Sequence, residues 1–206
     1  MGRVTRLGLL GGTFDPPHFG HLIAAQEAAD LLGLERVLFV PAGRPPHKQG
    51  EPLSPLAARL RMVELAIAGN PRFGLSRADV ERPGPSYTAD LLAGFRARLR
   101  SAAELYFLVG MDSLRDLLTW KEPARILAQC TLVAVSRPGH SPLDPAALEA
   151  ELPGAGRRVR VLATPGVDIS STDLRARVAA GRPIRYLVPD AVRELIERER
   201  LYLLSS

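Results

Sequence analysis

The sequence predicts an α/β protein with a doubly wound, mainly parallel sheet and helices on both of its faces. The main observation is an alternation along the chain. Short apolar runs, typical of buried strands, alternate with longer segments whose apolar residues recur at helical spacing. With 206 residues, 46% of them hydrophobic, the chain can bury one sizeable core. We therefore expect a single domain over residues 1–206.

The first predicted strand spans residues 4–10 and ends at the pair Gly11-Gly12, and the helix that follows carries its apolar residues over 22–32. Glycines in the turn between them let backbone N–H groups approach an anion, and Thr13 adds a hydroxyl donor. The new helix contributes unpaired N–H groups and the positive end of its dipole. We therefore expect this turn to bind phosphate.

His18 and His21 lie three residues apart at the start of that helix, so both imidazoles can donate hydrogen bonds toward the turn. Taken alone, two such histidines are also explained as helix caps or as metal ligands. Cys130 is the only cysteine, and no His-Glu-x-x-His pattern completes a zinc site. The glycines fit neither the dinucleotide-binding G-x-G-x-x-G pattern nor a Walker A loop.

The run Gly-Thr-Phe-Asp-Pro-Pro-His-Phe-Gly-His over residues 12–21 resembles the (T/H)xGH motif of the nucleotidyltransferase superfamily, in its adenylyltransferase form. The resemblance implies a Rossmann-like fold and a catalytic role for His18 and His21. The ATP-binding residues that it implies in this stretch are Gly11, Gly12, Thr13 and Phe14.

The second predicted strand, residues 36–40, leads into a proline-rich loop over 41–48. Doubly wound sheets bind ligands at the carboxyl ends of their strands, so the basic side chains of this loop are placed to meet a second anion. A solvated basic loop explains them equally well. The segment Pro-Pro-His-Lys resembles the substrate-phosphate loop of nicotinate or nicotinamide mononucleotide adenylyltransferases, which implies a mononucleotide contact for His47 and Lys48.

The next pattern predicts a packing helix over residues 54–69. Two short extended pieces are predicted at 73–76 and 79–81, and a second helix is predicted to start after Ser86, its cap residue. The run Gly-Pro-Ser-Tyr-Thr resembles the segment by which bacterial nicotinate mononucleotide adenylyltransferases hold the pyridine carboxylate. It implies that backbone N–H groups near Tyr87 and Thr88 bind that carboxylate. Without the resemblance, the run is explained as a capped helix start.

A continuous apolar strand over residues 105–109 runs into a further strand-to-helix turn at the same edge of the sheet. Asp112 can accept hydrogen bonds from ribose hydroxyls, or it can cap the helix. The resemblance to the family's Gly-x-Asp turn implies that Gly110 and Asp112 contact ATP. Trp120 is explained as a core residue, whereas in the family a tryptophan here stacks on the pyridine ring.

The remaining strands are predicted at residues 131–135 and 159–163, separated by a peripheral excursion with a helical patch at 146–152. The loop after the first of these strands carries Arg137, which is placed to meet a phosphate of the mononucleotide. A charged amphipathic helix is predicted through Leu201. Its partial likeness to a Nudix helix fails at positions where that motif needs glutamate or glycine.

A second anion site is predicted where a helix follows the last strand. Ser170 is placed to cap this helix, and hydroxyls and a guanidinium cluster at its amino terminus. Helix capping alone also explains the serines. The run Ile-Ser-Ser-Thr-x-Leu-Arg resembles the superfamily's second signature, which holds the triphosphate of ATP. It implies that role for Ile169, Ser170, Ser171, Thr172 and Arg175.

Composition limits the partners. No run of 18 apolar residues and no export signal are visible, so we expect a cytoplasmic protein without a membrane partner. The net charge of +5 suits polyanionic nucleotides, but the arginines are scattered without an RNA-binding aromatic pattern, so we expect no nucleic-acid partner. Lysine occurs only at Lys48 and Lys121. A homo-oligomer is left open.

The resemblance covers nearly the whole chain and implies a bacterial-type nicotinate mononucleotide adenylyltransferase, which makes deamido-NAD and pyrophosphate from ATP and nicotinate mononucleotide. It implies that His18, His21 and Arg175 act in catalysis and that Mg²⁺ bridges the ATP phosphates. A pantetheine-phosphate adenylyltransferase, which shares both signatures, is one alternative. A non-catalytic nucleotide- or RNA-binding module on the same scaffold is another. The Pro-Pro-His-Lys and Ser-Tyr-Thr segments and Trp120 favour the pyridine nucleotide.

Overall fold

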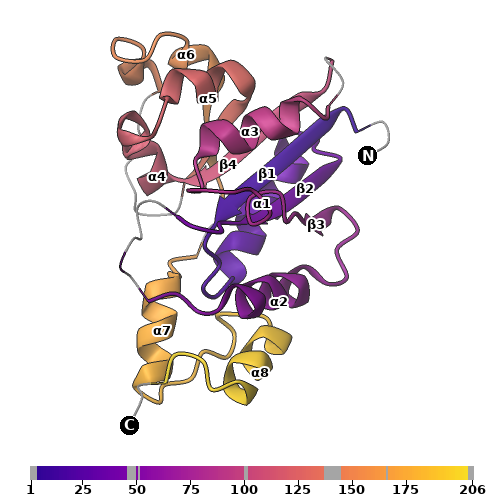
Figure 1. The fold of residues 1–206 in the computed structure, drawn as a ribbon, viewed down its shortest axis with the longest axis vertical. Helices are drawn as coiled ribbons and strands as arrows, with labels where there is room; N and C mark the ends of the chain where they lie inside the picture. The colour runs from indigo at the N-terminus through magenta and orange to yellow at the C-terminus, as the bar shows by residue number, and fades with distance from the viewer. Residues whose placement is uncertain are drawn as a thin grey trace.

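The computed structural model describes residues 4–45, 50, 52–99, 102–136, 145–165 and 167–203. Within them lies one six-stranded sheet, in the order β3-β2-β1-β4-β5-β6, with every neighbouring pair parallel (Figure 1). The Rossmann-like, doubly wound fold is confirmed. The strands are β1 (Arg6–Gly12), β2 (Arg36–Pro41), β3 (Phe73–Leu75), β4 (Glu104–Gly110), β5 (Thr131–Ser136) and β6 (Val159–Ala163).

The strand order reverses beside β1, because the chain builds outward to β3 first and then returns to place β4 on the other side of β1. Ligands of such sheets bind in the crevice outside the carboxyl ends of the strands at this reversal. In register, Gly12 pairs with Pro41 of β2, and Leu10 pairs with Leu108 of β4. β1 therefore runs through the glycine pair instead of ending before it, and it begins at Arg6 rather than residue 4.

Helices cover both faces of the sheet, and alternate residues of each strand pack against opposite layers. On β1, Leu9 belongs to the core under α3 and α5, whereas Leu10 belongs to the core under α1 and α2. The α-helices are α1 (Phe19–Leu31), α2 (Leu56–Ile67), α3 (Thr88–Arg96), α4 (Met111–Arg115), α5 (Pro123–Gln129), α6 (Ala155–Arg158), α7 (Ser171–Ala179) and α8 (Asp190–Arg198).

The two carboxyl-terminal helices, α7 and α8, lie next to α2 at one end of the molecule (Figure 1). Leu174 of α7 and Val192 and Ile196 of α8 are buried with Met62 of α2 in a third apolar cluster. α8 ends at Arg198 instead of reaching Leu201. The backbone then takes left-handed conformations, with φ of 53° at Arg200 and 66° at Tyr202, which a continuing helix does not allow.

Three local predictions are wrong. Residues 79–81 form a turn rather than an extended piece, and the carboxylate of Asp79 inside that turn binds several groups described below. Ser86 does not cap α3, since Tyr87 is the cap residue and Ser86 bonds to Asp79 instead. The helical patch at 146–152 is a 3-10 helix at Pro145–Leu148, followed by a turn.

Among the described residues, no helix is long and apolar enough to cross a membrane, and α1, the longest, has 13 residues.

Candidate active site

Two adjoining cavities lie at the carboxyl ends of β1 and β4. The α1 cavity, about 260 Å³, is bounded by the turn after β1, the start of α1, Asp112 and Ser171. The α3 cavity, about 190 Å³, is bounded by Thr88 and Trp120. The residues that line both cavities are Gly11, Gly12, Val109, Gly110 and Ser113. Two ligands in these cavities would meet across the glycine pair.

A larger cavity of about 600 Å³ lies at the opposite edge of the sheet, beside the first residues of β4 and β5 and four arginines. That edge carries the amino ends of the parallel strands, away from the crevice in which doubly wound sheets bind their ligands. We therefore place the candidate site in the two smaller cavities.

The glycine pair has no room for side chains. A Cβ atom at Gly11 would lie 2.9 Å from the ring of Phe107, and one at Gly12 would lie 3.3 Å from the ring of Phe14. Both contacts are tighter than ordinary packing allows, so this strand end keeps a bare backbone facing the cavities. Contact of these backbone groups with a ligand stays a prediction.

The two histidines stack on each other, with ring centroids 3.8 Å apart at an interplanar angle of 35°. His18 is the cap residue of α1 and is only 2% exposed, whereas His21 lines the α1 cavity. The backbone N–H of His18 donates to Nδ1 of His21 at 3.2 Å. Because Nδ1 accepts this bond, the neutral imidazole of His21 carries its proton on Nε2 and can donate it to a ligand.

Gly20 makes room for this stack. A Cβ atom at Gly20 would lie 2.9 Å from Nδ1 of His18. The glycine between the two histidines is therefore required by the position of the His18 ring, and not by an unusual backbone angle.

The loop between β1 and α1, residues 13–18, is called the motif loop below. Its second residue, Phe14, has a left-handed conformation at φ 52°, and the Asp15–Pro16 peptide bond is cis. A left-handed backbone is unfavourable for a phenylalanine, and burial of its ring compensates. That ring contacts His21 edge-on at a centroid distance of 5.1 Å and also packs on Phe39.

α7 is bonded to the motif loop. Arg175 Nη1 donates to the carbonyl oxygen of Asp15 at 2.9 Å, and the hydroxyl of Ser171 donates to that of Pro16 at 2.8 Å. The two sequence signatures therefore meet in space. Within the second signature, Ser171 lines the α1 cavity, while Ser170 caps the helix by accepting the N–H of Asp173 at 3.1 Å.

Two residues of the second signature have other roles in this structure. Ile169 is buried in the apolar cluster shared by α2, α7 and α8. Thr172 is exposed, and its hydroxyl lies 3.4 Å from Arg175 Nη2. Contact of either side chain with a nucleotide stays a prediction.

At the end of β4, Gly110 is the cap residue of α4, and Asp112 stands in the first turn, where its carboxylate lies 3.3 Å from Arg115 Nη1. Both line the α1 cavity, and their contact with ATP stays a prediction. The cavity wall also includes Ser113, Thr164 and Val167. Sequence reasoning did not single these out, because they belong to no motif.

The α3 cavity contains Thr88 and Trp120, and Trp120 packs edge-on against Phe107 with centroids 6.5 Å apart. Tyr87 is absent from the lining residues. Its backbone N–H donates to the carbonyl of Pro85 at 2.9 Å, and Lys121 Nζ sits 4.2 Å above its ring centroid. This cation–π contact gives one of the two lysines a local role. Thr88, at the first position of α3, is the better candidate donor of a backbone N–H.

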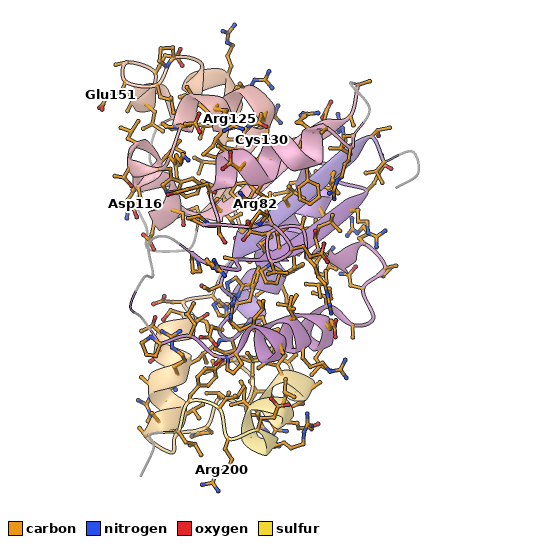
Figure 2. All side chains as sticks on the ribbon, in the orientation of Figure 1. Arg82, Asp116, Arg125, Cys130, Glu151 and Arg200 are labelled. Carbon is orange, nitrogen blue, oxygen red and sulfur yellow. The ribbon has the colours of Figure 1, made fainter. Side chains whose placement is uncertain are left out.

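Asp79 was missed by sequence reasoning, although it organises this cavity. Its carboxylate accepts the N–H of Gly43 at 2.9 Å, Arg82 Nη2 at 2.9 Å and the hydroxyl of Ser86. Ser86 Oγ in turn accepts the N–H of Arg44 at 2.9 Å. Asp79 thus joins the loop after β2 to the segment before α3, near which Figure 2 labels Arg82.

Three predicted mononucleotide contacts, His47, Lys48 and Arg137, lie outside the described residues. Within the part of the chain that the structure describes, no three His, Cys, Asp or Glu side chains are grouped so as to hold a metal ion.

Comparison with known proteins points to one kind of enzyme. The model of the cytidylyltransferase-like family matches residues 9–177. A probable nicotinate-nucleotide adenylyltransferase of Thermomicrobium roseum is 51% identical over 97% of this chain and 92% of its own length. A probable nicotinate-nucleotide adenylyltransferase of Thermus thermophilus is 52% identical over 96% of this chain and 99% of its own.

Among solved structures, the nicotinic acid mononucleotide adenylyltransferase of Plasmodium falciparum, complexed with NaAD, has the same fold. The TM-score is 0.79 at 18% sequence identity, and the match covers 96% of this chain and 97% of that one. The same enzyme complexed with APC matches with a TM-score of 0.77.

Proposed function

This chain belongs to the nicotinate-nucleotide adenylyltransferases of the cytidylyltransferase-like family, and on this premise we propose how its site works. The enzyme transfers the adenylyl group of ATP to nicotinate mononucleotide, forming deamido-NAD and pyrophosphate. The observation that supports this proposal most directly is the pair of cavities joined at Gly11 and Gly12. The α1 cavity would take ATP, and the α3 cavity would take the pyridine end of the mononucleotide.

The reaction needs positioning and charge stabilisation more than covalent chemistry. A phosphate oxygen of the mononucleotide attacks the α-phosphorus of ATP, and the bond from that phosphorus to the pyrophosphate oxygen breaks. Negative charge then moves onto the departing pyrophosphate. No side chain has to be phosphorylated or adenylylated.

His21 would stabilise this charge directly, because Nδ1 accepts the N–H of His18, which leaves the proton of the neutral ring on Nε2, and because the residue lines the α1 cavity. His18 is proposed to donate to a neighbouring phosphate oxygen, and it also orients His21 through its backbone N–H and through stacking. Arg175 would hold the triphosphate from α7, beside Ser171.

The donors around the α1 cavity fit a divalent cation that arrives with ATP. They include one carboxylate, Asp112, and the hydroxyls of Thr13 and Ser171. These groups are too few to supply all the ligands of a metal ion. Mg²⁺ is commonly held by one or two carboxylates together with substrate phosphates and water. We propose that ATP would supply most of the ligands of Mg²⁺ and that Asp112 is the carboxylate that would help to hold it. When bound, the cation would neutralise phosphate charge.

In the α3 cavity, the start of α3 favours an acid over an amide. Backbone N–H groups at a helix start and the positive end of the dipole attract a carboxylate. A carboxamide gains less from this field and must turn its own N–H donors away. Thr88 would supply the N–H contact, and Trp120 would stack on the pyridine ring.

Pyrophosphate release from ATP tests the proposal, with nicotinate mononucleotide, nicotinamide mononucleotide and pantetheine phosphate as acceptors. We expect nicotinate mononucleotide to give the highest kcat/KM, exceeding the amide by more than about tenfold. Preference for pantetheine phosphate would assign the sister activity. ATP binding without pyrophosphate release for any acceptor would indicate a non-catalytic nucleotide-binding module.

A further inference from the structure

A buried carboxylate lies inside the motif loop. Asp15 is 1% exposed and stands two residues after Thr13 and three before His18. Its Oδ1 accepts the hydroxyl of Tyr202 at 2.7 Å, and its Oδ2 accepts the backbone N–H of Ser54 at 3.0 Å. A buried charge is tolerated only when such bonds satisfy it. The side chain of Asp15 therefore faces away from the cavities, toward the carboxyl-terminal segment and α2.

Arg59 of α2 stands beside it as the compensating charge and is 2% exposed. Its Nη1 donates to the carbonyl oxygens of Thr13 at 3.0 Å and Ala42 at 2.8 Å, and its Nε donates to that of Ser54 at 3.3 Å. Burial lowers the pKa of Arg59, and the nearby Asp15 charge opposes that effect. The guanidinium thus fixes the backbone just before Asp15 and the end of β2.

Tyr202 comes from the far end of the chain, after α8. Its backbone is left-handed at φ 66°, and its side chain turns inward, with the hydroxyl also 3.8 Å from Sδ of Met62. Arg200, two residues earlier, is exposed and points away from the molecule in Figure 2. Burial, together with the Asp15 charge, raises the pKa of Tyr202, so the phenol stays protonated as a donor.

We propose that Tyr202 is a positioning residue for adenylyl transfer, acting through Asp15 on the motif loop. This inference rests on the proposed function. The hydroxyl of Tyr202 fixes the carboxylate of Asp15 from one side, while Arg59 fixes the preceding backbone from the other. Together they set the path of the chain that leads from the phosphate-binding turn to His18.

The geometry separates this role from simple anchoring of the chain end. The carboxyl-terminal segment is already held by Val192, Leu195 and Ile196 in the apolar cluster with α2. The hydroxyl of Tyr202 adds little to that packing, yet it meets the one carboxylate buried in the motif loop. Loss of the hydroxyl should therefore misalign the loop more than it loosens the fold.

The test is Tyr202→Phe in the full chain, which keeps the ring and removes the hydroxyl. We expect kcat for pyrophosphate release to fall about tenfold or more, while KM for both substrates stays within about twofold. The matched control is Tyr186→Phe. Tyr186 has the same left-handed φ of 66° but is 81% exposed, and we expect unchanged kinetics.

A double-mutant cycle with Asp15→Asn links the effect to its partner. We expect the two substitutions together to cost much less in kcat than the product of their separate effects, because they break one connection. If Tyr202→Phe does not fold, Asp15→Asn alone should show the same loss of kcat at unchanged KM. Normal kcat in a folded Tyr202→Phe enzyme, or independent effects in the cycle, would overturn the inference.

The unmodified enzyme separates this inference from the proposed function. No pyrophosphate release by that enzyme with ATP and nicotinate mononucleotide would refute the function itself. Turnover that is equal in the unmodified and Tyr202→Phe enzymes would refute only the role of Tyr202.

Discussion

The hydroxyl of Ser171 donates a hydrogen bond to the carbonyl oxygen of Pro16 at 2.8 Å, across 155 residues of sequence. Arg175, one helical turn later, reaches the carbonyl of Asp15 at 2.9 Å. α7 is therefore attached to the motif loop at two adjacent residues, and the groups proposed to hold the triphosphate also hold the loop that carries His18. Substitutions on α7 should affect ATP binding and turnover together.

Arg175→Ala tests this connection. Removing the guanidinium takes a cation from the triphosphate site and removes the hydrogen-bond donor to the carbonyl oxygen of Asp15. We therefore expect weaker ATP binding and a lower kcat, with kcat/KM for ATP reduced about 10²-fold. The matched control is Arg177→Ala on the same helix, because the side chain of Arg177 pairs with Asp173 at 2.7 Å and contacts no part of the motif loop among the described residues. Steady-state kinetics and calorimetric ATP titration of both variants measure the difference. ATP affinity unchanged by Arg175→Ala would assign Arg175 a purely structural role.

Gly20→Ala should disturb the histidine stack. The added methyl group would lie 2.9 Å from Nδ1 of His18, whose ring is buried and has little space to move. We expect kcat to fall about tenfold or more, because small displacements of catalytic groups are costly. Gly94→Ala in α3 is the matched control, since its Cβ meets nothing within 4 Å.

Gly94→Ala should leave kinetics unchanged and stabilise the fold by about 0.5–1 kcal/mol, because alanine is the better helix former. Thermal unfolding of both variants, run beside the kinetic assay, separates stability from alignment. Equal kcat in the two alanine variants would show that the stack tolerates the methyl group.

Trp120→Ala should weaken both pyridine mononucleotides by about 1–3 kcal/mol, if the ring stacks on the pyridine as proposed. A ring face does not distinguish an acid from an amide, so the ratio of kcat/KM between nicotinate and nicotinamide mononucleotide should be preserved. Trp120→Phe, which keeps an aromatic face, should recover part of the loss. A change in the ratio of more than about tenfold would place selectivity at Trp120 rather than at the start of α3.

Cys130, labelled in Figure 2, should resist thiol reagents in the folded enzyme. Burial raises the pKa of its thiol from 9.0 to about 12, and only the thiolate reacts. At pH 8 we expect alkylation of the folded chain to be at least about 10²-fold slower than in denaturant. Rapid labelling of folded protein at pH 8 would show that Cys130 is accessible.

The same shift in pKa predicts a stability change at high pH. Because the folded pKa is the higher one, the contribution of the neutral thiol is present below pH 9 and is lost as pH rises toward about 12. Unfolding free energies of the unmodified chain and Cys130→Ala should therefore converge over this range.

Much of the fold was predictable from the sequence because the relevant signals are local. Apolar runs identified five of the six strands closely, and the segment at residues 73–76 corresponds to β3. The capping role of Ser170 follows from one residue and its neighbour three positions on, and the structure confirms it. The glycine pair and the two histidines identify the strand-to-helix turn because all four residues lie within one short stretch of the chain, residues 11–21.

Only the tertiary structure determines which groups, distant in sequence, form hydrogen bonds with the residues of these turns. Nothing in the sequence around Asp15 indicates that its carboxylate meets Tyr202, 187 residues later, or that Asp79 joins two loops. The local sequence pattern predicts an extended segment at residues 79–81, but hydrogen bonds to the Asp79 carboxylate stabilise a turn there. Local sequence patterns specify whether the backbone is helical, extended or turned. The partners of a buried charge depend instead on how the whole chain packs, because the charge must be satisfied by the groups that the topology brings beside it.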